Sequence, residues 1–228
     1  MSQLANVDIW TINLNTKPVL TDLEILSSDE QTRYHRFVTQ ELKDKYLRAH
    51  SAKRKILAAY LKVLPDKVKL IENEHGKPAI QNSDWQFNLS HSGSQCLLAV
   101  VKNYAVGIDI ERITRPVDAL EISQRFFTAN EHDYILAADD EGAAFFKLWV
   151  RKEAVVKVLG EGLARSLHSF SVVHDIAPNG FAIDWFGENP LPNFMSQEIN
   201  VGAGYVAAIV VATSNATINF RHLLELAG

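Results

Sequence analysis

The sequence predicts an α+β fold made of two similar α/β lobes related by a pseudo-two-fold axis. In each half, helical patterns come first and about three or four short strands follow, so each half carries the elements of one helix-and-sheet unit. Hydrophobic residues make up 47% of the 228 residues and charged residues 22%, which is typical of a chain that buries a core. We therefore place one lobe in residues 1–106 and the other in residues 107–228.

The first lobe is predicted to begin with a strand over 7–14, followed by a short helix over 21–30. The cluster Ser27-Ser28-Asp29-Glu30 is typical of a helix start, and the apolar spacing after it predicts a helical pattern to about Val63. Runs of apolar or alternating residues predict further strands over 68–71, 85–89, 95–101 and 105–111, with a loop at 90–93.

The second lobe repeats this order. The strongest helical pattern in the chain covers 141–159 and is closed by Gly160, the residue that most often ends a helix. Two shorter helices are expected before it, over 118–127 and 130–138. Three strands are expected after it, over 170–173, 181–186 and 205–211.

Charge is distributed unevenly along the chain, whose net charge is −4. Residues 1–107 hold 14 Lys and Arg against 11 Asp and Glu, whereas residues 108–228 hold 9 against 16. Positions 33–69 alone carry 11 basic and 3 acidic side chains. This asymmetry predicts either a basic surface for anions on the first lobe or a well-solvated helix face. Nucleic acid is the weaker interpretation, because the whole chain is acidic and shows no alternation of aromatic and basic residues.

Several classes of protein are excluded. The longest nearly apolar run, 201–213, is shorter than the 18 or so residues that a membrane span needs, so no membrane association is expected. The first residues, 1–8, show no basic region followed by an apolar stretch, so no signal peptide is expected. A single cysteine, Cys96, excludes an internal disulfide and favours a reducing cytoplasm.

Two carboxylates, Asp109 and Glu111, alternate with apolar residues in Gly107–Glu111. Side chains alternate along a strand, so the two acids share one face and repel each other unless a cation lies between them. Oxygen ligands favour magnesium or manganese over zinc. The alternative is a strand with one solvated face at the edge of a sheet.

Three further groups of residues carry possible chemistry. Glu153 and Lys157 are four residues apart on the longest helix and project from the same side, which suits either a functional pair or an exposed ion pair. Ser90 and His91 lie in the predicted loop, whose backbone amides would cradle a phosphate unless the segment is a plain serine-rich turn. Lys77, between a glycine and a proline, is placed to touch an anion or to form a hairpin turn.

In combination and in order, these groups resemble the motifs of the 4′-phosphopantetheinyl transferases of the Sfp type. The matching stretches are Gly76-Lys77-Pro78, Phe87-Asn88-Leu89-Ser90-His91-Ser92-Gly93, Val106–Glu111 and Trp149–Lys157. They span residues 76–157, and the layout of the flanking chain is similar to the family's two-lobed chain, so the resemblance covers nearly the full length. Val150 departs from the small polar residue or cysteine often found there, at a position that is not a ligand position.

The resemblance implies an enzyme that transfers the phosphopantetheine arm of coenzyme A to a serine of an apo acyl- or peptidyl-carrier protein and releases adenosine 3′,5′-bisphosphate. It implies Asp109, Glu111 and Glu153 as ligands of magnesium, with manganese as the alternative, and Glu153 as the acceptor of the serine proton. Asp109 and Lys157 complete the implied catalytic set, with Lys157 steadying the pyrophosphate or the leaving group.

The resemblance also implies the residues that bind coenzyme A. Ser90 and His91 would hold phosphates, and Lys77 would lie at the adenosine end. The 3′-phosphate would be met from the basic segment, for which we expect Arg54 first, then Arg48 and Arg33. The family's two-lobed members further imply a monomer. Two other classes stay open: a magnesium pyrophosphohydrolase that cuts coenzyme A or a nucleotide, and a non-catalytic module that binds coenzyme A or a carrier protein.

Overall fold

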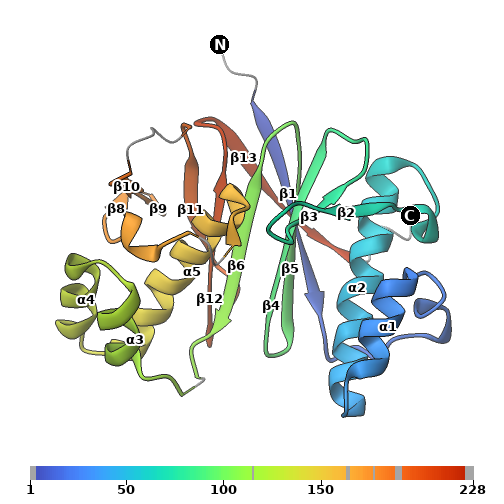
Figure 1. Cartoon of the computed structure of the whole chain (residues 1–228), viewed down its shortest axis with the longest axis horizontal. Coiled ribbons are helices and arrows are strands. Elements are labelled where there is room, and N and C mark those ends of the chain that lie inside the picture. The colour runs from blue at the N-terminus through green and yellow to red at the C-terminus, as the bar shows by residue number, and fades with distance from the viewer. Residues whose placement is uncertain (1–3, 115, 163–164, 177, 188–191, 224–228) are drawn as a thin grey trace.

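The computed structural model describes residues 4–114, 116–162, 165–176, 178–187 and 192–223, and it is a mixed α+β fold (Figure 1). Helices lie on the two outer sides and β-sheets lie between them. The helices are α1 (Ser28–Arg36) and α2 (Gln40–Leu61) on one side, and α3 (Ala119–Phe126), α4 (Ala129–Leu136) and α5 (Glu141–Leu159) on the other.

The first sheet has four strands in the order β13-β1-β5-β4, and α2 packs on one of its faces. Its strands are β1 (Ala5–Asn13), β4 (Trp85–Ser92), β5 (Gln95–Lys102) and β13 (Ala216–His222). Ile56 and Leu57 of α2 are fully buried against the alternate side chains of the sheet, such as Ile12 and Leu98. A hairpin of β2 (Leu70–Glu72) and β3 (Pro78–Ile80) lies beside this unit.

The second sheet has five strands in the order β6-β12-β11-β9-β8, and α5 covers one of its faces. Its strands are β6 (Val106–Arg112), β8 (Asp175–Ile176), β9 (Gly180–Phe181), β11 (Met195–Ile199) and β12 (Tyr205–Val211). A separate pair is formed by β7 (Phe170–Ser171) and β10 (Asp184–Trp185). The apolar faces of the two large sheets meet in a shared core, where Val7, Leu97, Ile108 and Ile209 are buried.

Local signals in the sequence explain where the main helices begin and end. Ser27 caps α1, since its side chain accepts a hydrogen bond from the backbone of Glu30, whose carboxylate bonds back to the Ser27 N–H. Asp140 caps α5 in a similar way, and Gly160 ends it with φ +74°, the left-handed conformation that glycine adopts without strain. The predicted bounds of α5 and β12 and the helix start at Ser27 are confirmed.

Two of the predicted helices are wrong. The range 21–30 is not one helix: a 3-10 turn at Leu20–Asp22 is followed by α1, because the capping box at Ser27 starts a new helix there. The helical pattern to Val63 is also interrupted, because Phe37 leaves the helical conformation and Thr39 caps α2. Strands β11 and β13 were not predicted, since neither is a continuous apolar run.

The predicted loop at 90–93 is wrong as well. Strand β4 continues through Ser92 and pairs with β5, with Ser90 opposite Leu97 and His91 opposite Cys96. The turn begins only at Gly93, which has φ +59°. The segment is therefore not a phosphate-cradling turn of free amides, although Ser90 and His91 remain candidates through their side chains.

The chain crosses between the two predicted lobes. Strand β13, from the predicted second lobe, pairs in parallel with β1 and completes the first sheet. The division into residues 1–106 and 107–228 stays a prediction. Among the helices of the described residues, none is both long and apolar enough to cross a membrane.

Candidate active site

The candidate site lies where β4 and β6, the edge strands of the two large sheets, face each other. Side chains of β4 bond to the edge of β6 that faces away from its backbone partner β12, and so join the two strands. The three bonds are from the N–H of Ile108 to Asn88 Oδ1 (2.9 Å), from that of Ile110 to Ser90 Oγ (3.4 Å) and from that of Arg112 to Ser92 Oγ (3.1 Å). We call Asn88, Ser90 and Ser92 the side-chain ladder.

The two serines of the side-chain ladder also orient the two acids of β6. Ser90 Oγ donates to Asp109 Oδ1 at 2.6 Å, and Ser92 Oγ donates to Glu111 Oε2 at 2.7 Å. A hydroxyl that accepts from backbone and donates to a carboxylate has a fixed direction. The geometry of β4 therefore sets the positions of both carboxylates.

Helix α5 brings a cation to the same place. Lys157 Nζ donates to Asp109 Oδ1 at 2.6 Å and to the carbonyl of Ile108 at 3.2 Å. The helix can come this close because Gly107 has no side chain: a Cβ there would lie 2.1 Å from the carbonyl oxygen of Ala154. Gly107 is thus required for the contact between α5 and β6.

Glu153 lies within electrostatic reach of these groups. Burial raises the pKa of the Glu153 carboxyl above its ordinary value, and the negative charges of Asp109 and Glu111 raise it further, while Lys157 opposes them. The structure therefore places Lys157 in contact with Asp109, and Glu153 near enough for the charges of Asp109 and Glu111 to act on its carboxyl.

One of the two carboxylate oxygens of Asp109 is available to bind a cation. Asp109 is only 5% exposed; its Oδ1 accepts from Ser90 and Lys157, while its buried Oδ2 has no hydrogen-bond partner among the described residues. Carboxylate oxygens are the ligands that magnesium and manganese prefer. In the part of the chain that the structure describes, however, no three or more His, Cys, Asp or Glu side chains already stand in metal-binding geometry. The donor type fits such an ion, and the metal assignment stays a prediction.

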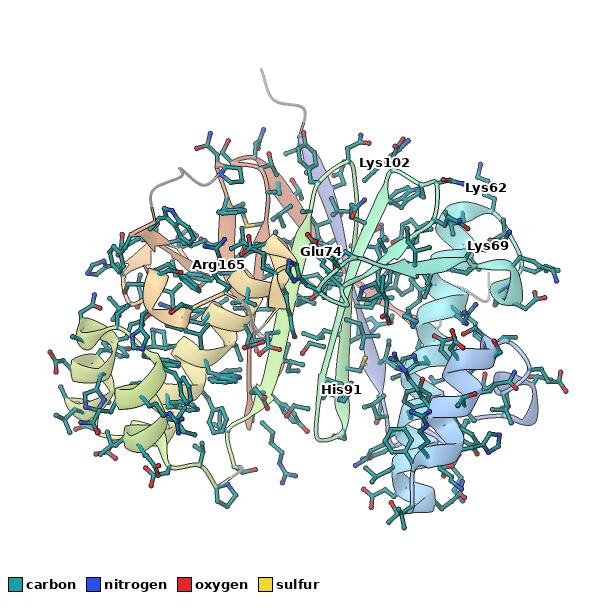
Figure 2. The ribbon with its side chains drawn as sticks, in the orientation of Figure 1. Lys62, Lys69, Glu74, His91, Lys102 and Arg165 are labelled. Atoms are coloured by element: carbon teal, nitrogen blue, oxygen red, sulfur yellow. The ribbon has the colours of Figure 1, made fainter. Side chains whose placement is uncertain are left out.

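His91 lies at the end of β4, near its turn to β5 (Figure 2). Desolvation of the imidazole ring lowers the pKa of His91 below its ordinary value, and the positive charge of Lys157 lowers it further. His91 also interacts electrostatically with His50 of α2. His91 therefore lies within electrostatic range of both Lys157 and His50.

This groove, of about 940 Å³, is open to solvent and lies between α1, α2 and the β2–β3 hairpin. The basic side chains that line it are Arg33, Arg36, His50, Lys53, Arg54 and Lys69. Acidic side chains line it as well, among them Glu30 and Glu72. We call it the basic groove.

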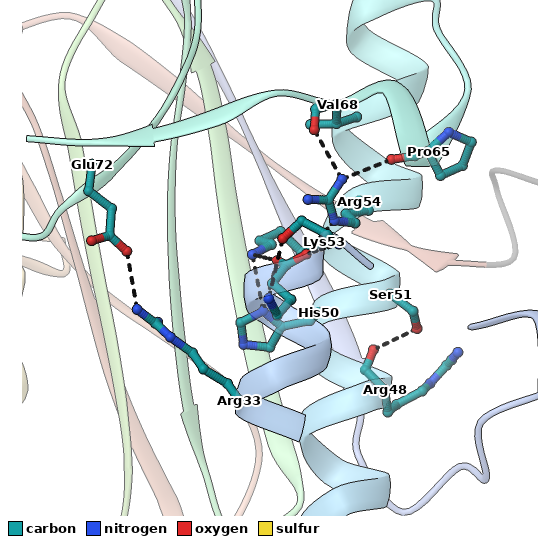
Figure 3. Close-up of polar contacts among 11 residues, drawn as sticks. Arg33, Arg48, His50, Ser51, Lys53, Arg54, Pro65, Val68 and Glu72 are labelled. Atoms are coloured by element: carbon teal, nitrogen blue, oxygen red, sulfur yellow. Dashed lines mark hydrogen bonds and ion pairs between the residues drawn. The ribbon is translucent and has the colours of Figure 1, made fainter. Parts of the chain in front are cut away.

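The three arginines predicted to bind the 3′-phosphate lie at different positions relative to the basic groove. Arg54 is 2% exposed, with its guanidinium bonded to Glu30 and to the carbonyls of Pro65 (3.2 Å) and Val68 (3.0 Å). Arg33 is exposed and reaches Glu72 at 3.5 Å, while Arg48 extends away from both (Figure 3). The structure thus brings Arg33 and Arg54 to the basic groove and leaves Arg48 outside its lining.

Lys77 points away from the basic groove. Its Nζ donates to the backbone carbonyls of Lys157 (2.6 Å), Val106 (3.2 Å) and Val158 (3.4 Å). Burial lowers its pKa to about 8. The predicted contact with the adenosine end stays untested, and the ammonium already has protein partners.

The sequence analysis did not identify Asn88, Ser92 and Lys53 as residues of the site. Asn88, Ser90 and Ser92 are polar at every second position of one strand, which is the signal of a polar face meeting another element. Lys53 gave no comparable signal, because nothing in a helical pattern marks which lysine will meet a buried carboxylate such as Glu30, 2.7 Å away.

Comparisons with known proteins match both halves of the chain. Residues 13–103 match a family model described as 4′-phosphopantetheinyl transferase, N-terminal, and residues 105–210 match the 4′-phosphopantetheinyl transferase superfamily. The chain is 35% identical to the 4′-phosphopantetheinyl transferase HetI of Nostoc sp. over 167 residues, covering 70% of each chain. It is 32% identical to Sfp of Bacillus subtilis over 162 residues, covering 64% of this chain and 71% of Sfp.

The chain belongs to the 4′-phosphopantetheinyl transferases, of the type represented by Sfp, as the sequence motifs implied. It is therefore an enzyme. Its motif residues Asp109, Glu111, Glu153 and Lys157 all fall in the segment that matches the superfamily model.

Proposed function

We propose that this enzyme transfers the 4′-phosphopantetheine group of coenzyme A to a serine of an apo acyl- or peptidyl-carrier protein, in a magnesium-dependent reaction that releases adenosine 3′,5′-bisphosphate. Membership of the family supports the reaction class. The observation that carries the proposal is Asp109, which bonds to Ser90 and Lys157 and whose buried Oδ2 has no hydrogen-bond partner in the part of the chain that the structure describes.

The reaction is a displacement at phosphorus. The serine oxygen of the carrier forms a bond to the phosphorus that bears pantetheine, and the bond from that phosphorus to the bridging pyrophosphate oxygen breaks. The leaving group keeps this oxygen and departs as adenosine 3′,5′-bisphosphate. The serine proton goes to Glu153, directly or through a water.

The ammonium of Lys157 lies beside Asp109, and from there it would stabilise the charge that grows on the leaving phosphate. Asp109, Glu111 and Glu153 would hold the magnesium ion, or manganese in its place. When bound, the ion supplies positive charge that neutralises the pyrophosphate.

The basic groove is the proposed place of the adenosine 3′-phosphate. Arg33 offers an exposed guanidinium, and Lys53 and Arg54 add positive charge even though Glu30 holds both. Ser90 and His91, between this groove and the acids, would contact the phosphates; in this scheme Ser90 shifts its bond from Asp109. Arg48 was expected at the 3′-phosphate and Lys77 at the adenosine end; neither lines the groove, whereas Arg33 does, which supports Arg33 for the 3′-phosphate.

We further infer that the two halves are related by a pseudo-two-fold axis, since each places a helix on one face of a sheet and the two sheets share a core. One chain then supplies both the basic groove and the acids, so we propose that the monomer is active. We also propose a cytoplasmic location, where coenzyme A and carrier proteins occur.

The test is one incubation of the enzyme with coenzyme A, magnesium and an apo-carrier protein, followed by intact-mass measurement. We expect the carrier to gain the mass of phosphopantetheine, and a carrier with its serine changed to alanine to gain none. Cleavage of coenzyme A without carrier would identify a pyrophosphohydrolase instead. Binding without any cleavage would identify a non-catalytic module.

A further inference from the structure

The C-terminal end of α5 is completed by side chains from the other half of the chain. The last carbonyls of a helix have no partner within it and need one from elsewhere. The carbonyl of Val156 accepts from the N–H of Gly160 at 3.0 Å. Lys77 Nζ meets the carbonyls of Lys157 and Val158, and Asn73 Nδ2 donates to that of Gly160 at 2.9 Å.

Both donors come from the turn that joins β2 and β3, and this turn is itself ordered by hydrogen bonds. Asn73 Oδ1 accepts from the backbone N–H groups of His75 (3.0 Å) and Lys77 (2.8 Å). The backbones of Asn73 and Lys77 bond to each other at 3.0 Å, and Gly76 has φ +81°. The turn therefore presents two side chains to α5 in a fixed direction, and Figure 1 shows the hairpin extending across β4 toward β6.

The contact between turn and helix is close. A Cβ on Gly160 would lie 3.2 Å from Lys77 Cδ and 3.3 Å from Asn73 Nδ2. The last turn of α5 also packs directly on Gly107 of β6. The last turn of α5 is thus held by two elements, the β2–β3 turn and β6.

Lys77 also joins the helix to the strand that carries the acids. The same ammonium that meets α5 donates to the carbonyl of Val106 at 3.2 Å, at the first residue of β6. Asp109 lies three residues further along this strand, and Lys157 carries both the carbonyl that Lys77 holds and the ammonium that meets Asp109. A positive charge at a helix C-terminus is in addition favourable to the helix dipole.

We propose that the β2–β3 turn is a clamp that positions the last turn of α5 for catalysis, with Lys77 and Asn73 as positioning residues that do not contact coenzyme A. This inference rests on the proposed transfer reaction. It assigns the Gly76-Lys77-Pro78 motif a different task from the one that the resemblance implied.

The two tasks predict opposite kinetics. In Lys77→Met the side chain keeps its length and loses its donors, so the clamp opens. We then expect kcat to fall about tenfold with the KM for coenzyme A changed less than about twofold, because Lys157 and Asp109 act on the transition state. A KM raised with kcat retained would overturn the proposal and make Lys77 a ligand of coenzyme A.

Asn73→Asp is the second variant. The carboxylate keeps the acceptor that orders the turn but removes the donor to Gly160 and places a negative charge against its carbonyl. As for Lys77→Met, we expect kcat to fall while the KM for coenzyme A changes little. The control is Lys102→Met, at an exposed lysine on β5 (Figure 2), which should leave both constants unchanged. If Lys77→Met does not fold, Asn73→Asp alone carries the test.

Hydrogen exchange gives a readout that does not depend on catalysis. In both clamp variants the amides of residues 156–160 should exchange about tenfold faster than in the wild type, while those at the start of α5 stay unchanged. Unchanged exchange in Asn73→Asp would overturn the clamp. An inactive wild type would instead refute the proposed transfer, and the exchange comparison would still decide whether the clamp exists.

Discussion

The Ser90 hydroxyl donates a 2.6 Å hydrogen bond to Oδ1 of Asp109, from a strand that belongs to the other sheet. Lys157 shares the same oxygen, so the two oxygens of this carboxylate differ: Oδ1 has two donors, and the buried Oδ2 has none among the described residues. A buried carboxylate oxygen without a partner is unfavourable unless something else satisfies it. This unpartnered oxygen lies where the proposed reaction would place a cation.

Asp109→Asn is expected to lower the transfer rate at least about 100-fold, or about 2.7 kcal/mol in the activation free energy. The amide keeps the shape and can still accept from Ser90, but it loses the negative charge that faces Lys157 and would hold the ion. The melting temperature should move by only a few degrees, because the lost ion pair with Lys157 is offset by relief of the repulsion with Glu153. Rate and melting curve are measured on the same preparation.

The matched control is Asp133→Asn, at an exposed acid of α4 whose side chain has no part in the site. It should leave both the rate and the melting temperature unchanged. A wild-type rate in Asp109→Asn would remove Asp109 from the metal and catalytic assignments.

Asn88→Ala tests the side-chain ladder. Asn88 is 6% exposed, and its Oδ1 is the partner of the Ile108 N–H. Truncation leaves that buried donor unsatisfied, so we expect the free energy of unfolding to fall by about 1–3 kcal/mol. Urea unfolding measures it, with Asn6→Ala, at an exposed position of β1, as the control. A change as small as that of the control would mean that the ladder adds no stability.

The sequence indicated the acids and the cation of the candidate site because they lie in local patterns. Asp109 and Glu111 alternate on one strand, and Glu153 and Lys157 are one helical turn apart, so short-range spacing already placed them. Their meeting follows from tertiary contacts such as Gly107 on α5, which pattern analysis does not reveal.

The errors have equally physical causes. Ser90-His91-Ser92-Gly93 was predicted as a loop because serine and glycine favour turns, yet the serines of this strand satisfy the edge of β6. Arg54, which stays a prediction at the 3′-phosphate, is buried and bonded to Glu30, a pairing that its basic neighbourhood in the sequence did not reveal. Which charge pairs with which is decided by packing, and the sequence alone does not show it.

His50 predicts a pH dependence of stability. The ring stacks on Tyr46, with centroids 4.0 Å apart, and Nδ1 lies 3.2 Å from Glu30 Oε1. Burial lowers the His50 pKa from 6.5 to about 4. Between these values the unfolded chain binds the proton that the folded chain excludes, so stability is lost as the pH falls from 6.5 toward 4.

His50→Gln removes this titration. The wild type should lose about 1–2 kcal/mol more than the variant between pH 7 and pH 5, as measured by urea unfolding at both values. His35→Gln, at an exposed histidine of α1, should follow the wild type. Parallel losses in wild type and His50→Gln would show that His50 does not carry the effect.

Lys157→Ala should reduce kcat more than it raises the KM for coenzyme A. The Lys157 ammonium is held at Asp109 and at the Ile108 carbonyl, so it is already in place before charge develops on the leaving phosphate. Groups placed in advance against developing charge lower the barrier rather than the ground state, and we expect kcat to fall by about 100-fold. Steady-state kinetics with varied coenzyme A decide this; an effect confined to KM would make Lys157 a binding residue.

Glu153 has two proposed roles, ion ligand and proton acceptor, that one variant separates. In Glu153→Gln the amide is a weaker ligand, and it cannot accept the serine proton at neutral pH. If Glu153 were a ligand only, excess magnesium would restore most of the rate. We expect the rate instead to stay at least about 100-fold low at saturating magnesium, because a general base contributes 10²–10⁴-fold. The assay varies magnesium at fixed coenzyme A and carrier, with Glu141→Gln, at the exposed start of the same helix, as the unaffected control. Recovery of the full rate by magnesium would assign the proton to a water and leave Glu153 as an ion ligand alone.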